Sequence, residues 1–324
     1  MEPALVDIQE LEVSYLQQGK RVSVVKDVSF TIGQGEIVGL VGESGCGKSV
    51  TSRAIIGMIK RPGRIENGTI RFDGKELTSL CAKEYQKVRG KEIAMIFQEP
   101  MTSLNPVYTI GEQLMETILT HLNMTKAQAK EHALDMLKKV GISMPEQRFL
   151  QYPGELSGGM RQRVMIAIAL SCNPKLLIAD EPTTALDVTI QAQILDLMRT
   201  LCHSQQMSTL VVTHDLGVVA ELCQRVIVMY SGEVVEMSNV KGIFDMPLHP
   251  YTQALLKSIP QIGARSEELY TIPGIVMPPA KQEKGCRFHP RCDRCQQRCT
   301  QQKPPLVQLE GGRQVRCWLY EQEG

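Results

Sequence analysis

The sequence predicts an α/β fold organised around a phosphate-binding loop, and three observations support this. The octapeptide Gly42–Ser49 reads G-x-x-x-x-G-K-S and directly follows Ile37–Val41, an apolar run typical of a buried strand. The segment Val50–Met58 resembles a helix, so the octapeptide lies at a helix N-terminus, where anions are favoured. Far downstream, another apolar run ends on Asp180 and Glu181, at the carboxyl end of a strand, where α/β sheets bind ligands.

Length and composition are those of a globular protein. The 324 residues, 43% hydrophobic and 22% charged, suffice for one large α/β domain with an appendage or for two modest domains. The formal net charge is +1, so no overall field favours nucleic acid or an anionic membrane. The apolar runs are shorter than the roughly 18 residues of a membrane span, and no secretory signal pattern opens the chain. We therefore expect a cytosolic protein that reaches a membrane only through a partner.

The N-terminal part reads as strands. Leu5–Tyr15 and Val22–Ile32 alternate between apolar and polar residues, which is typical of half-buried strands. Tyr15 ends the first of them, and either packs on the sheet or offers a flat surface to an adenine ring; the residues alone leave both open. The dipeptides Asn67-Gly68 and Asp73-Gly74 bracket a short β segment, and both are hairpin signals.

The chain changes from strand to helix beyond Gln98. Ile93–Phe97 is a short buried strand that ends at Gln98, and Pro100–Gly154 reads as a mostly helical insertion. Within it, Thr125 and Gln128 have the spacing of a capping box, which predicts a helix start.

The octapeptide and the acidic pair have the chemistry of nucleotide hydrolysis. Glycines let backbone N–H groups close around phosphate oxygens, Lys48 would reach the β- and γ-phosphates, and the Ser49 hydroxyl would bind Mg²⁺. Asp180 suits the water shell of Mg²⁺, and Glu181 can orient and deprotonate an attacking water. The alternatives are a Gly-rich turn and a solvated strand end, and the apolar run before the two acids disfavours the latter.

Two further segments could contact phosphate. Leu156–Gln162 places a serine and two glycines at the start of the helical run Val164–Ser171, which makes a second anion site. His214 directly follows the strand Thr209–Thr213. A lone histidine there is more often structural, but its place at the end of a core strand favours a γ-phosphate contact.

In this order, the motifs resemble those of the ATP-binding cassette (ABC) ATPases over about residues 1–245. The resemblance implies a P-loop NTPase fold over residues 1–248, with a RecA-like core, an antiparallel β-subdomain and a helical subdomain at about 100–172. The implied motifs are the Walker A loop at Gly42–Ser49, the Q-loop at Gln98, the signature at Leu156–Gln162, the Walker B pair at Asp180-Glu181, the D-loop at Ala185-Leu186-Asp187 and the switch histidine at His214.

The resemblance also implies ATP and Mg²⁺ as cofactors, with Glu181, Lys48, Gln98 and His214 in catalysis and Ser49, Gln98 and Asp180 on Mg²⁺. In this family two cassettes sandwich two ATP molecules, and Ser157 and Gly159 complete the partner's site. Met160 stands where the family commonly has glutamine. The residues implied to bind nucleotide are Tyr15, Gly42, Glu43, Ser44, Gly45, Cys46, Gly47, Lys48, Ser49, Val50, Gln98, Ser157, Gly158, Gly159, Asp180 and Asp187.

A narrower resemblance links four segments to the ATPase subunits of dipeptide and oligopeptide importers: Phe97–Pro106, His249–Leu256, Cys286–Cys292 and Val315–Leu319. It implies a subunit that powers import from the cytoplasmic face of the inner membrane as a peripheral protein. The implied partners are a second ABC ATPase subunit, two transmembrane permease subunits and an extracytoplasmic peptide-binding protein, and membrane contact runs through the permease alone. Importers of nickel and glutathione are close relatives and remain alternatives.

A rival class is the ABC ATPase that acts on nucleic acid or the ribosome. Chromosome-tethering types need a long coiled coil between Gln98 and Leu156, and that interval is too short; translation-factor types carry two cassettes in one chain. The net charge of +1 also does not indicate a basic surface for nucleic-acid phosphates, so we expect no nucleic-acid partner. Complete catalytic motifs disfavour a purely regulatory metal sensor.

Cysteines crowd the extension at residues 249–324, which predicts a metal site. Spacing alone selects Cys286, Cys292, Cys295 and Cys299, because Cys292-x-x-Cys295 is a common metal pair. The importer resemblance selects Cys286, Cys292, Cys299 and Cys317 instead, and implies a 4Fe–4S cluster. The alternative is a zinc site that serves only to fold this extension, called the tail below. The scattered thiols are expected to be reduced core residues: Cys46, Cys81, Cys172, Cys202 and Cys223.

Overall fold

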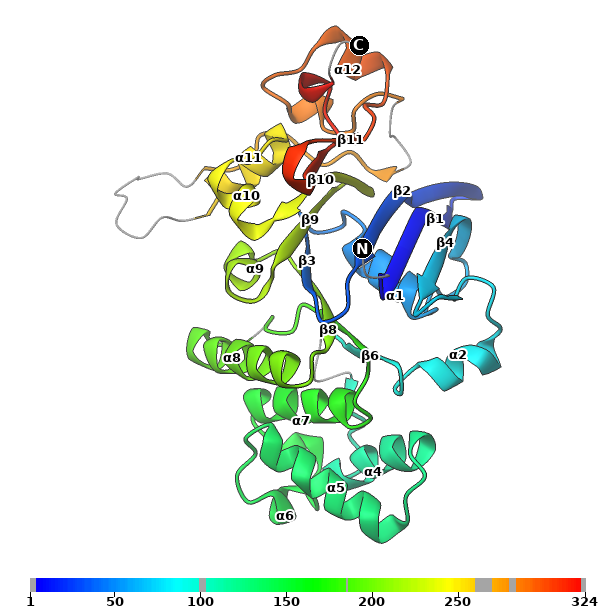
Figure 1. The fold of residues 1–324 in the computed structure, drawn as a ribbon, viewed down its shortest axis with the longest axis vertical. Helices are drawn as coiled ribbons and strands as arrows, with labels where there is room; N and C mark the ends of the chain where they lie inside the picture. Colours follow the sequence, from blue (N-terminus) through cyan, green and yellow to red (C-terminus); the bar gives the residue numbers. More distant parts are fainter. Residues whose placement is uncertain (1–3, 99–102, 185, 260–269, 280–283, 322–324) are drawn as a thin grey trace. The chain divides into compact units, whose positions relative to one another are not determined.

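The structure is a computed structural model that describes residues 4–98, 103–184, 186–259, 270–279 and 284–321. The chain divides into two compact units. Unit 1 comprises Met1–Ile32, Ile37–Thr78 and Val212–Gly324, and unit 2 comprises Gly33–Glu36 and Ser79–Val211. Unit 1 therefore contains the phosphate loop and the C-terminal tail, while unit 2 contains the helical insertion and the acidic strand end (Figure 1). The predicted boundary between residues 248 and 249 stays a prediction.

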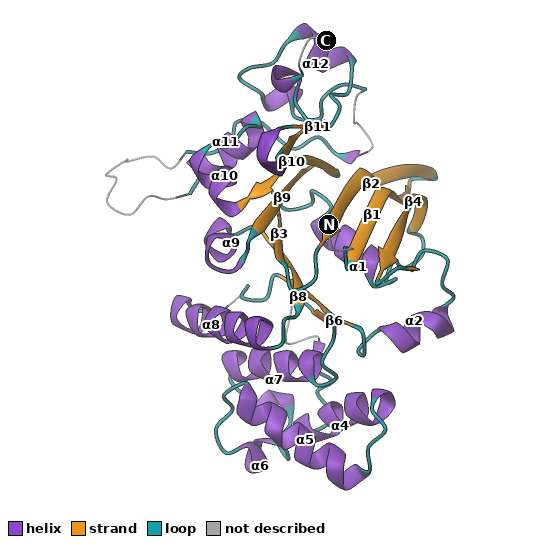
Figure 2. Ribbon diagram, in the orientation of Figure 1, coloured by secondary structure: helices purple, strands orange, loops and turns teal. Residues whose placement is uncertain are grey.

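An antiparallel sheet forms one part of unit 1 and confirms the predicted β-subdomain. Its strands are neighbours in the order β2-β1-β4-β5, and Figure 2 shows β2, β1 and β4 side by side. Their bounds are β1 Val6–Gln17, β2 Lys20–Ile32, β4 Arg64–Phe72 and β5 Lys75–Glu76. Apolar residues that alternate along these strands, among them Ile8, Val13 and Val25, are fully buried, as the sequence pattern predicts.

The hairpin prediction at Asn67-Gly68 was wrong. Both residues lie inside β4, where the pairing with β1 shifts register next to Glu12, and the turn to β5 is at Asp73-Gly74. Gly68 has φ +92°, and a Cβ there would lie 2.5 Å from the carbonyl oxygen of Gln9. The glycine thus serves a close backbone approach within a distorted ladder rather than a turn.

A mixed sheet carries the phosphate loop of unit 1. Strands β11, β12, β10, β9 and β3 are neighbours in that order, with β3 parallel to β9 and the other pairs antiparallel. The bounds are β3 Ile37–Val41, β9 Arg225–Tyr230, β10 Glu233–Asn239, β11 Val307–Gln308 and β12 Gln314–Val315. The two tail strands, β11 and β12, therefore extend the sheet that holds the loop.

The helices of unit 1 are short. The predicted helix Val50–Met58 begins earlier, at Lys48, and ends at Ile55. The bounds are α1 Lys48–Ile55, α9 Leu216–Leu222, α10 Val240–Asp245, α11 Pro250–Lys257 and α12 Gln297–Gln301, with single 3₁₀ turns at η3 His289–Arg291, η4 Glu310–Gly312 and η5 Trp318–Tyr320.

One core joins the sheet of unit 1 to the tail. Tyr230 of β9, Tyr251 of α11 and Phe288 of the tail are buried together, with ring centroids 4.6 to 5.4 Å apart. The partly buried Cys286 and Cys292 pack against this cluster. The tail is therefore part of the hydrophobic core that also contains Val41, the last residue before the phosphate loop.

Unit 2 combines strands with the predicted helical insertion. Strands β8, β7 and β6 are neighbours in that order, and β6 and β7 run parallel. The capping box at Thr125 and Gln128 is confirmed at the start of α5. The bounds are β6 Ile93–Ile96, β7 Leu176–Asp180, β8 Ser208–Thr213, α2 Ala82–Val88, α4 Ile110–His121, α5 Lys126–Lys139, α6 Pro145–Arg148, η1 Pro153–Glu155, α7 Gly158–Leu170 and α8 Val188–Ser204, with β8 running across the unit boundary.

Candidate functional site

The phosphate loop connects β3 to α1, as the octapeptide predicts. Gly42 has φ +152°, and a Cβ there would lie 2.2 Å from the Met229 carbonyl oxygen, so only glycine fits. The Lys48 side chain is buried, and its Nζ donates to the carbonyl oxygens of Gly42 at 2.7 Å and Glu43 at 3.1 Å. The loop therefore holds a positive charge against its own first residues, beside the N-terminus of α1, and this arrangement suits phosphate.

Two residues outside the predicted motifs hold the start of this loop. The Tyr251 hydroxyl accepts a hydrogen bond of 2.8 Å from the Glu43 amide. Arg291 of the tail donates to both carboxylate oxygens of Glu43, at 2.7 and 3.0 Å. Neither contact was predicted from the sequence, because both join segments more than 200 residues apart.

Tyr15 and His214 also lie in unit 1. The half-buried Tyr15 ring packs against Gly63, where a Cβ would lie 2.6 Å from its Cε1. His214 is exposed directly after β8, in a turn that Asp215 stabilises by accepting from the Gly217 amide at 2.7 Å. The adenine and γ-phosphate contacts of these residues stay predictions.

The acidic strand end lies in unit 2. Asp180, the last residue of β7, is 1% exposed, and Glu181 follows it with a left-handed φ of +50°. The Glu181 Oε2 atom accepts hydrogen bonds from Gln98 Nε2 at 2.7 Å and from Thr184 Oγ1 at 3.0 Å. The structure thus brings together two predicted catalytic residues, Gln98 and Glu181, which are 83 positions apart in the chain.

The signature segment begins α7, as predicted. Ser157 is the N-cap, and its hydroxyl accepts from the Met160 amide at 3.3 Å. The buried Gln162 donates at 2.6 Å to the carbonyl of Pro182, which ties this helix to the segment after the acidic pair. Asp187 caps α8. Of the predicted D-loop, Ala185 lies outside the described residues.

Four tail cysteines line one cavity: Cys286, Cys292, Cys299 and Cys317. These are the four that the importer resemblance selects. Cys295 is exposed, lies outside this cavity, and its thiol donates to the Gln296 carbonyl. The cavity is otherwise mainly apolar, with Phe288, Trp318 and Leu319 in its lining. All ten cysteines are free thiols, so soft sulfur donors are available there for a metal centre.

Burial disfavours the anionic form of the Cys286 and Cys292 thiols. Burial, with a smaller contribution from the neighbouring thiols, raises the pKa of Cys286 to about 12. Burial likewise raises the pKa of Cys292 to about 11. In the part of the chain that the structure describes, no group of three or more His, Cys, Asp or Glu side chains is placed to hold a single metal ion.

The comparisons place these features among known proteins. A family model described as "ABC transporter" matches residues 25–184, and a model described as "Oligopeptide/dipeptide transporter, C-terminal region" matches residues 235–299. The chain is 53% identical to the oligopeptide transport ATP-binding protein AppD of Bacillus subtilis, over 99% of this chain and 98% of the relative. It is 48% identical to the dipeptide transport ATP-binding protein DppD of Escherichia coli, over 97% and 96%.

Solved structures agree with this fold. The post-hydrolysis dimer of the ATP-binding cassette MJ0796 with ADP and phosphate has a TM-score of 0.66 at 30% identity, over 73% of this chain and 99% of that one. The cbiO1 protein of Clostridium perfringens, part of the ABC transporter complex cbiONQ, has a TM-score of 0.65 at 26% identity, over 76% and 92%.

Proposed function

The chain belongs to the ABC transporter family, as an ATP-binding protein of the oligopeptide and dipeptide importer type, and from this membership we propose that it hydrolyses ATP to power the import of dipeptides or oligopeptides. The observation that carries the substrate class is the match of residues 235–299 to the C-terminal region of such transporters, beyond the general ABC match. The curated relatives described above are named for oligopeptides and dipeptides, which favours peptides over nickel, glutathione or nucleic acid.

Each residue of the nucleotide site has a distinct role in this proposal. Lys48 and the backbone N–H groups of the loop would bind the phosphates, and Ser49, Gln98 and Asp180 would hold Mg²⁺. When bound, Mg²⁺ neutralises charge on the β- and γ-phosphate oxygens. Glu181 orients the attacking water and accepts its proton. The hydrogen bonds from Gln98 and Thr184 support this role, because they fix the orientation of the carboxylate.

The membrane partners follow from the same proposal. Among the described helices, none has the length and apolar character needed to cross a bilayer. We propose that the chain binds two permease subunits from the cytoplasmic face, pairs with a second ATPase subunit and depends on an extracytoplasmic peptide-binding protein.

We propose that the permease docks near Glu99–Pro106, of which residues 99–102 lie outside the described part. Directly after it, the side chains of Val107 and Tyr108 are 71% and 51% exposed. Tyr108 also lines a shallow hollow with Glu112 and Glu116. The exposed Val107 and Tyr108, beside this acidic hollow, suit contact with a cytoplasmic helix of the permease.

The tail is proposed to bind a 4Fe–4S cluster through Cys286, Cys292, Cys299 and Cys317. Their shared cavity supports this set over the one that includes Cys295. Zinc draws four sulfurs to about 2.3 Å from a single ion, whereas a cluster distributes four thiolates over separate irons. Four thiolates suit either centre, and we propose the cluster because the importer resemblance implies it. Its role is structural, in a tail too small to fold around a core of its own.

The proposed function is tested by the ligand of the assembled transporter. The complex is purified with its binding protein, and the bound ligand is identified by mass spectrometry. We expect short peptides. Recovery of nickel or glutathione as the sole ligand would contradict the peptide assignment. The assignment as an ATPase would still hold.

The Glu181→Gln variant should bind ATP but hydrolyse it about 10²- to 10⁴-fold more slowly, because a general base is lost. Turnover is measured on the assembled complex with the partner subunit's own site disabled. The exposed Glu131→Gln is the matched control and should keep full activity. Near-normal hydrolysis by Glu181→Gln would remove Glu181 from this role.

Ser103→Cys should cross-link to a cytoplasmic loop of the permease, with a yield that changes when nucleotide is added. The exposed Cys81 and Cys295 are first replaced by serine, so that the new thiol reports alone. His203→Cys on α8 serves as an exposed control and should not cross-link. If cysteines placed at every position from Glu99 to Pro106 gave no product, the docking surface would lie elsewhere.

Protein purified without oxygen should be brown and contain about four iron and four sulfide per chain. Cys317→Ser should lose most of the iron, because it removes one of the four ligands. Cys295→Ser, the matched control, should retain it. Colourless protein with one zinc would contradict the cluster, and iron loss in Cys295→Ser alone would contradict the ligand set.

A further inference from the structure

We propose that the tail loop, Cys286–Cys292, positions the phosphate loop, and that Arg291 is the positioning residue through which it acts on Glu43. The proposal rests on nucleotide binding at Gly42–Ser49, as proposed above. Arg291 does not contact the reacting atoms; its effect reaches them through the backbone of the phosphate loop.

The Arg291 side chain is built into a fixed place. It is 4% exposed and forms a bidentate ion pair with Glu43. Its other N–H groups donate to the carbonyls of Pro273 and Ile272 at 2.9 and 3.2 Å, and to the Tyr230 hydroxyl at 3.3 Å. Five contacts satisfy the five donors of a guanidinium, so the group cannot turn without losing hydrogen bonds.

Glu43 transmits this contact to the phosphate loop. Its amide donates to the Tyr251 hydroxyl, and its carbonyl accepts from Lys48 Nζ at 3.1 Å. Residue 43 is therefore held from outside by Arg291 and Tyr251, and it in turn holds the lysine that is proposed to bind phosphate. A shift of Glu43 displaces an acceptor of Lys48.

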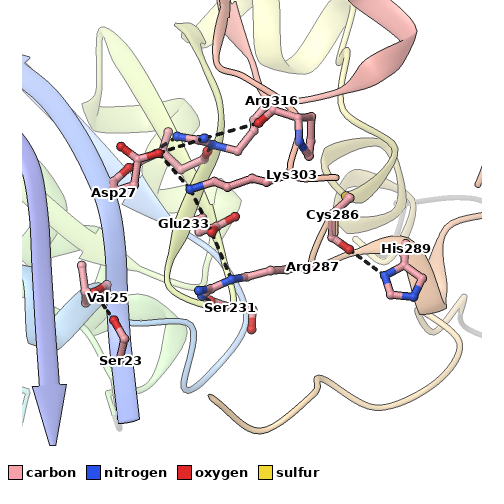
Figure 3. A network of polar contacts seen from close by, with 12 residues as sticks. Ser23, Val25, Asp27, Ser231, Glu233, Cys286, Arg287, His289, Lys303 and Arg316 are labelled. Atoms are coloured by element: carbon pink, nitrogen blue, oxygen red, sulfur yellow. Dashed lines mark hydrogen bonds and ion pairs between the residues drawn. The ribbon is translucent and has the colours of Figure 1, made fainter. Parts of the chain in front are cut away.

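A second contact holds the other end of the loop. Arg287 of the tail loop pairs with Glu233 at 3.1 Å and donates to the Ser231 carbonyl, as Figure 3 shows. The next residue, Gly232, donates its amide to the Cys46 carbonyl at 2.8 Å. The tail loop thus acts on the phosphate loop near both ends: directly at residue 43 and through one turn at residue 46.

A salt network fixes this second contact to the rest of unit 1. Lys303 contacts Glu233 at 3.1 Å and Asp27 at 2.8 Å, and Arg316 contacts Asp27 at 3.1 Å (Figure 3). The Glu233 side chain is 5% exposed, so its charge depends on these cations. The tail is therefore attached to the rest of unit 1 by charge pairs, of which Arg287–Glu233 is buried, as well as by apolar packing.

The test is nucleotide affinity of the full-length chain, measured by titration with a fluorescent ATP analogue. We expect Arg291→Gln and Glu43→Gln each to weaken binding about tenfold. The double variant should bind no more weakly than either single one, because both remove the same contact. Arg291→Lys should have a nucleotide affinity between those of the unmodified protein and Arg291→Gln, since it keeps the charge but loses the bidentate geometry. Amide exchange at Gly42–Ser49 should become faster in each weakened variant.

Three comparisons make the result decisive. Arg298→Gln, in the same tail but paired with Glu321 and stacked on Trp318, should keep normal affinity. Tyr251→Phe removes only the hydroxyl that accepts from Glu43, and should weaken binding even if Arg291→Gln does not fold. Lys48→Ala tests the nucleotide site itself: normal binding by that variant would refute the proposed site rather than the tail loop.

Affinity within twofold of normal for folded Arg291→Gln and Tyr251→Phe, or additive losses in the double variant, would overturn the proposal.

Discussion

The phosphate loop must present bare backbone N–H groups in one shape, and the rest of unit 1 depends on this constraint. A glycine-rich loop has few side chains with which to stabilise itself and loses much conformational freedom on folding. Its shape is therefore imposed by neighbours. The Met229 carbonyl abuts Gly42, and the Gly232 amide binds the Cys46 carbonyl. These supports come from β9 and the turn after it, which are distant in sequence but adjacent in the sheet.

The tail completes this support rather than forming a separate appendage. Phe288 packs in the same core as Tyr230 and Val41, and the two tail strands extend the sheet beside β10. Buried ion pairs also favour one position of the tail over others, because removal of one partner leaves an uncompensated charge. Detaching the tail would leave Glu233 in such a state and would expose the aromatic cluster. The tail is therefore a structural part of the nucleotide-binding unit, although its cysteine-rich sequence differs from that of the rest of the unit.

Local patterns predicted most of the elements but few of the contacts between them. Alternation identified β1 and β2, and the octapeptide identified its loop, because these signals span a few residues. The turn prediction at Asn67-Gly68 failed because the dipeptide signal does not report a distorted ladder. Arg291 and Glu43 could not have been paired, since they are 248 positions apart in a chain with 36 basic and 35 acidic residues. Only the fold selects one pair among so many.

The two proposals for the tail share a physical basis. Cys286 and Cys292 end the tail loop, and the arginines between them contact Glu43 and the turn beside Cys46. Metal binding to thiolates supplies free energy to the segment that carries them. A metal centre that binds both cysteines would thus fix both ends of the tail loop. It would also restrict the movement of Arg287 and Arg291, which lie between them. Under these two proposals a metal centre in the tail would act by placing the two guanidinium groups, and no electron transfer would be needed.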